Sequence, residues 1–169
     1  MPGPMSASAH HLAQVNIGRL VAPLESPPIA DFVAALEPVN ARADAAAGFV
    51  WRLQTEEGDA TALRVFDDET LVNMSVWESL EALRAFVYAD REHLAIMRRR
   101  REFFERMETF MALWWIEAGT IPTLADAEER LTLLRAIGPS PDAFTFRRSY
   151  PPPGAATVPV DDDRDLCPA

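Results

Sequence analysis

The segment 71–77, Leu-Val-Asn-Met-Ser-Val-Trp, most constrains the fold of this chain. Side chains alternate between the two faces of a strand, so the segment presents two rows. The rows are Asn73, Ser75 and Trp77 on one face and Val72, Met74 and Val76 on the other. Because neither row is typical of a solvated face, the pattern predicts a sheet covered on both sides, with the polar and aromatic row lining a cavity. An alternative stays open, in which Trp77 fills the core and Asn73 is a structural amide, since buried polar groups normally find hydrogen-bond partners.

Composition narrows the class of protein. A chain of 169 residues with 49% hydrophobic content suits one compact domain. Its net charge of −10 disfavours binding to nucleic acid, which requires clustered positive charge. We expect no membrane association and a cytoplasmic location, because no apolar run is long enough to cross a bilayer and residues 1–11 lack signal-peptide features.

Residue usage also excludes several chemistries. Cys167 is the only cysteine, so neither an internal disulfide nor a paired-cysteine metal site can form. All 16 basic residues are arginines, which excludes a lysine Schiff base and a P-loop lysine. No nucleotide, hydrolase or metalloprotease motif and no cluster of spaced metal ligands occurs. We expect neither a metal nor a cofactor.

The pattern of hydrophobic residues predicts a folded domain over 11–148, between a disordered segment 1–10 and a disordered Pro- and Asp-rich tail 149–169. Strands are predicted over 12–20, 49–54, 71–77 and 110–117. A helix begins after Ser26, is kinked or split by Pro38 and ends at Gly48. Ser79 starts a helix, a further helix covers 91–107, and Thr123 with Asp126 starts the last one.

This β-α-β-β-α-β order with an extra C-terminal helix predicts an α+β fold of the ferredoxin-like type, with an antiparallel sheet and helices on one face. The opposite, apolar face must also be covered. Packing of two subunits through this face is the simplest solution, and a homodimer is therefore predicted.

The strand Asn73-Met74-Ser75-Val76-Trp77, the first-strand segment Gln14-Val15-Asn16 and the strand order resemble the dimeric α+β barrel superfamily, which includes antibiotic-biosynthesis monooxygenases. The stretch 11–146 most closely resembles an uncharacterised family of domains of unknown function in that superfamily. The resemblance to the cofactor-independent monooxygenases implies pocket roles for Asn16, Asn73 and Trp77. It also implies that the substrate is a flat phenol, which is deprotonated and then passes an electron to O2. Amide groups of the protein would stabilise the resulting oxyanion.

Further candidates complete the predicted site. His93, Met97 and Arg101 are spaced to share one helix face, and His93 could serve as a general base or a haem ligand, or be a helix residue without function. Arg52 is expected to pair with an acid or to meet a ligand. The other predicted substrate contacts are Gln14, Trp51, Ser75 and Trp114.

The leading hypothesis is a cofactor-independent oxygenase of a polycyclic or phenolic natural product. The alternatives are a redox-neutral cyclase or isomerase that uses His93 as its base, and a non-catalytic dimer that binds a ligand such as haem.

Overall fold

A computed structural model describes residues 9–54, 70–107, 110–155 and 159–161. The elements run in the order β1 (His10–Arg19), η1 (Pro27–Ile29), α1 (Ala30–Asp44), β2 (Phe49–Arg52), β3 (Thr70–Trp77), α2 (Leu80–Ala89), α3 (Arg91–Arg98), α4 (Arg100–Phe103), β4 (Met111–Glu117), α5 (Leu124–Ile137), β5 (Arg148–Ser149) and β6 (Val160–Asp161). The predicted connection after β2, the predicted disordered segment up to residue 8 and most of the C-terminal tail lie outside the described residues.

The four long strands form an antiparallel sheet in the order β2-β3-β1-β4. This order, with a crossover helix after β1 and helices between β3 and β4, confirms the predicted ferredoxin-like α+β fold. In the pairing of β1 with β3, Asn16 lies opposite Asn73 and Gln14 lies opposite Ser75. The polar rows of the two central strands therefore lie next to each other on one face of the sheet.

Helix α1 is a single helix that contains Pro38, so the predicted split does not occur. A proline inside a helix removes one backbone hydrogen bond and crowds the preceding turn. Pro38 is exposed, which lets the carbonyl that loses its partner turn toward water. The helix then ends before Gly48, whose φ of 79° suits a residue without a side chain.

Capping residues set the boundaries of the next helices. The side chain of Ser79 accepts a hydrogen bond from the backbone N–H of Ala82, as predicted for the start of α2. The carboxylate of Asp90 accepts from the backbone N–H of His93 and starts α3. The predicted continuous helix over 91–107 is interrupted at Arg99, where α3 ends and the short α4 begins.

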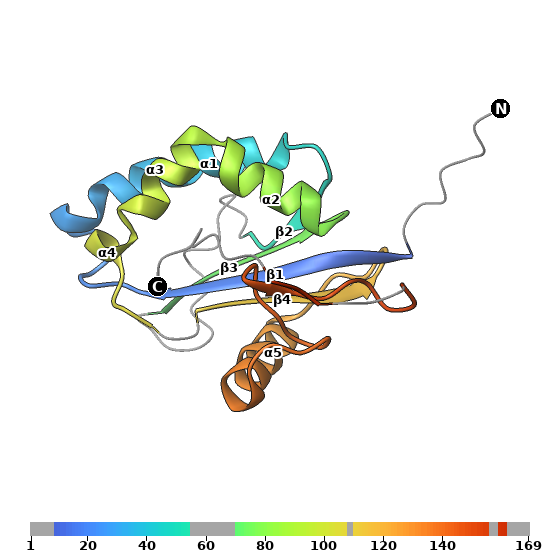
Figure 1. Ribbon diagram of the computed structural model, residues 1–169. Helices are drawn as coiled ribbons and strands as arrows, with labels where there is room; N and C mark the ends of the chain where they lie inside the picture. Colours follow the sequence, from blue (N-terminus) through green and yellow to red (C-terminus); the bar gives the residue numbers. More distant parts are fainter. Residues whose placement is uncertain (1–8, 55–69, 108–109, 156–158, 162–169) are drawn as a thin grey trace.

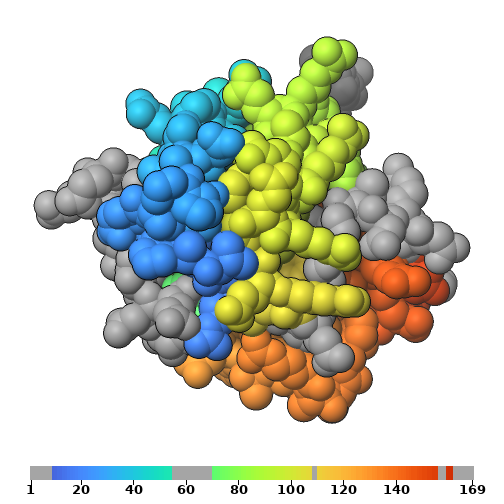
Figure 2. Space-filling view, turned by 90° about the vertical axis from the view of Figure 1, so that its left-hand side faces the viewer, coloured from blue at the N-terminus to red at the C-terminus, as the bar shows by residue number. Residues whose placement is uncertain are grey.

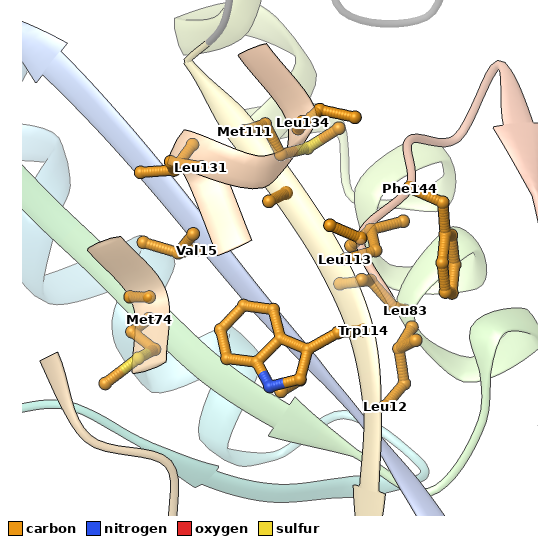
Figure 3. Close-up of a cluster of buried hydrophobic side chains, with 14 of the residues drawn as sticks. Leu12, Val15, Met74, Leu83, Met111, Leu113, Trp114, Leu131, Leu134 and Phe144 are labelled. Carbon is orange, nitrogen blue, oxygen red and sulfur yellow. The ribbon is translucent and has the colours of Figure 1, made fainter. Parts of the chain in front are cut away.

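Helix α5 lies on the opposite side of the sheet from α1, α2 and α3 (Figure 1). The prediction that helices cover one face only is therefore wrong for the extra C-terminal helix. Its buried stripe of Ala127, Leu131 and Leu134 packs in the same hydrophobic cluster as the apolar sheet row (Figure 3). The apolar face is thus buried within a single chain. The homodimer stays a prediction, but the exposed face that motivated it does not exist.

Residues 149–155 and 159–161 of the predicted tail are described in the structure, and some of them contact the domain. Ser149 is buried, and β5 pairs with β6 through Arg148 and Asp161. The backbone carbonyl of Tyr150 accepts a hydrogen bond from Trp115 Nε1 at 2.8 Å. These contacts attach the described part of the predicted tail to the domain.

Candidate functional site

A cavity of about 200 Å³ lies between the polar face of the sheet and the helices α1, α2 and α3. Its floor is formed by β1 and β3, and Phe49, Arg52 and Leu53 line it near β2. Most of its roof is apolar, with contributions from Phe32, Leu36 and Val39 of α1, Leu83, Phe86 and Val87 of α2, and Ile96 and Met97 of α3. A concave, mostly apolar space with a few polar groups is the usual form of a small-molecule site.

The polar row on the cavity floor is hydrogen-bonded within itself. Gln14 Nε2 donates to Asn73 Oδ1 at 2.7 Å and to Ser75 Oγ at 3.0 Å. Asn16 makes no side-chain hydrogen bond with the described part of the chain, and the oxygen of Asn73 is the atom that Gln14 engages. The amide group of Asn16 and the NH2 group of Asn73 are therefore available to a molecule in the cavity.

Trp77 forms the wall at one end of the cavity. It is only 1% exposed, stacks on Phe86 with ring centroids 5.3 Å apart, and meets the edge of Phe49. Its Nε1–H donates to Ser75 Oγ at 2.9 Å. Because this N–H already has a partner, Trp77 offers a ligand its ring rather than a hydrogen bond, and Ser75 acts as its structural partner.

His93 lies in the roof near Phe86, with ring centroids 5.2 Å apart. Its Nδ1 is 3.3 Å from the carbonyl oxygen of Val87. A carbonyl can only accept, so this contact places the proton on Nδ1 and leaves the lone pair on Nε2. Burial lowers the pKa of His93 below its ordinary value, against opposing effects of the Val87 carbonyl and of Asp90. His93 is therefore neutral at pH 7, as a general base must be.

A β-bulge decides which side chain of β2 reaches the cavity. Phe49 pairs with Trp77, but the register then shifts, so that Trp51 pairs with Val76 and Arg52 with Ser75. The extra residue reverses the predicted alternation and turns Arg52 toward the cavity face and Trp51 away from it. The predicted contact of Trp51 with substrate is not supported, since Trp51 does not line the cavity.

The predicted pairing of Arg52 does occur. Its Nε donates to Asp44 Oδ1 at 2.7 Å and its Nη2 to Asp44 Oδ2 at 3.2 Å, which joins β2 to the end of α1. Arg52 therefore lines the cavity with its guanidinium already engaged by a carboxylate.

The break at Arg99 separates the three residues predicted to share a helix face. His93 and Met97 line the cavity, whereas Arg101 belongs to α4 and is exposed. Arg100 lines the cavity instead and is 8% exposed. Sequence reasoning could not select it from four consecutive arginines, because such residues point in all directions around a helix.

Trp114 is also placed elsewhere than predicted. It pairs with Ala13, so its side chain lies on the apolar face of the sheet, where it is 2% exposed and packs in the core beneath α5 (Figure 3). The neighbouring Trp115 points to the other face and contacts Phe144. Trp114 is a packing residue and does not line the cavity.

The described residues limit the chemistry and the location of the site in two ways. They contain no group of three or more histidine, cysteine or acidic side chains arranged to hold a metal ion. None of the helices in the described ranges is both long and apolar enough to cross a membrane.

Comparison with solved structures gives similarities at low sequence identity. The protein PA3566 from Pseudomonas aeruginosa is 15% identical over 70% of this chain and 100% of its own, with a TM-score of 0.44. SnoaB, a cofactor-independent oxygenase from Streptomyces nogalater, is 19% identical over 69% of this chain and 98% of its own, with a TM-score of 0.40. Rv0793 from Mycobacterium tuberculosis is 14% identical over 67% of this chain and 99% of its own, with a TM-score of 0.42.

No curated protein matches this chain. A family described as "Domain of unknown function (DUF3291)" matches residues 11–160, which cover the four-stranded sheet except for His10 and include all the helices that surround the cavity. The chain is thus a member of the DUF3291 family, a domain of unknown function.

Proposed function

We propose that this protein is a cofactor-independent oxygenase that oxidises a small phenol, of one or two fused rings, inside the cavity between the sheet and the helices. The observation that carries the proposal is the neutral imidazole of His93. Its tautomer is fixed by Val87, and it lines the same apolar cavity as the available amides of Asn16 and Asn73. A base and oxyanion-stabilising donors within one cavity are what oxidation of a phenol by O2 requires of a protein.

The proposed reaction begins with transfer of the phenol proton to Nε2 of His93. The resulting phenolate gives one electron to O2, and recombination at a ring carbon that carries hydrogen forms a hydroperoxide. Loss of water then yields a quinone, so that a hydroxyarene plus O2 becomes a quinone plus H2O. The amides of Asn16 and Asn73 stabilise the phenolate oxygen, and the surrounding apolar side chains exclude water.

The cavity volume sharpens the substrate class. An apolar cavity of about 150 Å³ accepts benzene, and this one measures about 200 Å³. It therefore suits one or two rings rather than the extended polycycle that the sequence analysis also considered. It is also much smaller than a porphyrin, so we do not propose haem binding. Trp77 and Phe86 stack on each other and together form one aromatic wall, against which a flat ring can pack.

Oxygen uptake by purified protein with 1,5-dihydroxynaphthalene tests the proposal. We expect one O2 to be consumed for each hydroxynaphthoquinone formed. The quinone is quantified by its visible absorption. The variant His93→Asn keeps an N–H donor for Val87 but removes the base, and should lower the rate by about 100- to 10,000-fold. His10→Gln, at the start of β1 and outside the cavity lining, is the matched control and should be unaffected.

Two results would contradict this function. Equal rates for the wild type and His93→Asn would exclude His93 as the base. Conversion of a bound phenol without oxygen, at the same rate as in air, would instead indicate a redox-neutral isomerase or cyclase. The same neutral imidazole could serve that reaction, so the anaerobic measurement separates the two chemistries.

A further inference from the structure

The face of α1 that lines the cavity carries an amide among apolar side chains. All of α1 lies within the described ranges, and Asn40 is its one polar residue in the cavity lining. The others follow at helical spacing and are all apolar: Phe32, Ala35, Leu36, Val39 and Ala43. Asn40 makes no side-chain hydrogen bond with the residues that the structure describes. When a ligand displaces water from the cavity, this amide must bond to the ligand or stay unpaired, which is costly.

The two helices α1 and α3 lie side by side in the roof and run in opposite directions. Asp31, near the start of α1, pairs with Arg99, just after the end of α3, at 2.9 Å. Arg42, near the end of α1, pairs with Glu92, at the start of α3. Figure 2 shows the helices in contact at the molecular surface, with α1 in light blue and α3 in yellow-green.

This arrangement brings Asn40 and His93 to the same end of the roof. Asn40 precedes Arg42 by two residues, and His93 follows Glu92 by one. Both residues are therefore less than one helical turn from the ion pair that joins the two helices. Because both also line the cavity, one ligand can contact the amide of Asn40 and the imidazole of His93 at neighbouring atoms.

The two groups differ in what they can bind. The Nδ1–H of His93 is directed at the carbonyl oxygen of Val87, so its Nε2 can only accept a hydrogen bond. The amide of Asn40 has an NH2 donor and an oxygen acceptor, so it can bind a hydroxyl, an ether or a carbonyl oxygen. In the proposed reaction, the floor amides of Asn16 and Asn73 already stabilise the phenolate oxygen. A further amide in the roof is therefore suited to a second oxygen.

We infer that Asn40 is a substrate-binding residue and that the substrate carries a second oxygen substituent, on a ring carbon next to the hydroxyl that His93 deprotonates. This inference rests on the proposed function for the role of His93 and for the ring itself. It narrows the substrate class from any small phenol to phenols with two neighbouring oxygens.

Binding of three naphthols to the purified protein, measured by calorimetry without oxygen, tests this inference. 2-Naphthol has one hydroxyl, 2,3-dihydroxynaphthalene has a second one on the neighbouring carbon, and 2,6-dihydroxynaphthalene has it at the far end of the other ring. We expect the wild type to bind the 2,3-isomer about three- to tenfold more tightly than the 2,6-isomer, which corresponds to one additional neutral hydrogen bond. The two isomers have the same composition, so only the position of the second hydroxyl differs.

Asn40→Leu replaces the amide by an apolar side chain of similar shape and should abolish the preference for the 2,3-isomer. It should not lower the midpoint of thermal unfolding, because the amide has no partner among the described side chains. Ala34→Leu is the matched control, since it places the same leucine on the exposed face of α1, outside the cavity lining. The control should keep the preference. Asn40→Ala also removes the amide and provides a second variant if Asn40→Leu does not fold.

The outcomes separate this inference from the proposed function. If the wild type binds the 2,3-isomer no more tightly than the 2,6-isomer, the second oxygen is overturned, whereas binding of 2-naphthol would leave the phenol site in place. If Asn40→Leu keeps the preference, another group binds the second hydroxyl and Asn40 is not the contact. The expected preference without any oxygen uptake in air would support Asn40 as a binding residue and contradict the oxygenase. If none of the three compounds binds, both this inference and the two-ring phenol of the proposed function are wrong.

Discussion

The two faces of the central sheet are built by the same strands but differ in what covers them. On one face, the row from Ala13 to Ile17 meets the stripe of α5, and its side chains are almost fully buried. On the other, Gln14 and Asn16 lie under α1 to α3, which leave a cavity of about 200 Å³. One face is filled to the density of a core and the other is not.

The difference between the faces separates stability from function along a single strand. Period-two alternation means that neighbouring residues contribute to different faces. A side chain on the α5 face has only packing to provide, since apolar neighbours surround it. A polar side chain over the cavity has either to find a partner within the protein or to meet a ligand. Substitutions on the two faces should therefore have different consequences.

The largest effect is expected for Trp114→Ala on the filled face. Trp114 is 2% exposed, and removal of a fully buried tryptophan side chain costs about 3–5 kcal/mol of the free energy of unfolding. Chemical denaturation monitored by circular dichroism measures this loss. Asn73→Ala, on the opposite face of the neighbouring β3, is the comparison and should cost less than about 1 kcal/mol. Similar losses for both would show that the cavity face is also a packing surface.

The second prediction concerns the polar row on the cavity face, in which Ser75 and Asn73 should have different roles. Ser75 is buried and accepts hydrogen bonds from Trp77 Nε1 and Gln14 Nε2, whereas Asn73 is exposed at the cavity. Ser75→Ala leaves the buried N–H of Trp77 without its acceptor and should cost about 1–3 kcal/mol of unfolding free energy. Asn73→Ala should instead lower oxygenase activity with little loss of stability. If Ser75→Ala were neutral, the row would not depend on Ser75 as its central acceptor.

Much of the fold could be predicted because its signals are local. The strand alternation at 71–77, the cap at Ser79 and the capping box of Thr123 with Asp126 each act within a few residues, and each is present in the structure. The same alternation placed Gln14, Asn16, Asn73 and Ser75 on one face, and all four line the cavity.

The remaining placements depend on irregularities that periodicity cannot show. One extra residue in β2 turns Trp51 away from the cavity, whereas Arg52 lines it. One break at Arg99 replaces Arg101 by Arg100 at the cavity. The position of α5 depends on contacts between distant segments, so the sequence pattern alone could not distinguish this helix from a second subunit as the cover of the apolar face.

The smallest expected effect concerns the ionisation of His93, which tests whether the cavity face is as dry as its lining indicates. Burial lowers the pKa of His93 in the folded protein below the ordinary value of 6.5 that holds in the unfolded chain. Between these two pKa values the unfolded chain binds more protons, so the free energy of unfolding falls as the pH drops below about 6.5 and levels off below the folded-state pKa. The slope that His93 adds cannot exceed about 1.4 kcal/mol per pH unit.

Denaturation of the wild type and of His93→Asn between pH 7.5 and 5 isolates the contribution of His93, because the carboxylates titrate in both proteins. The wild type should lose more stability than the variant as the pH falls, and parallel curves would mean that the imidazole is solvated and that water fills the site proposed for the phenol.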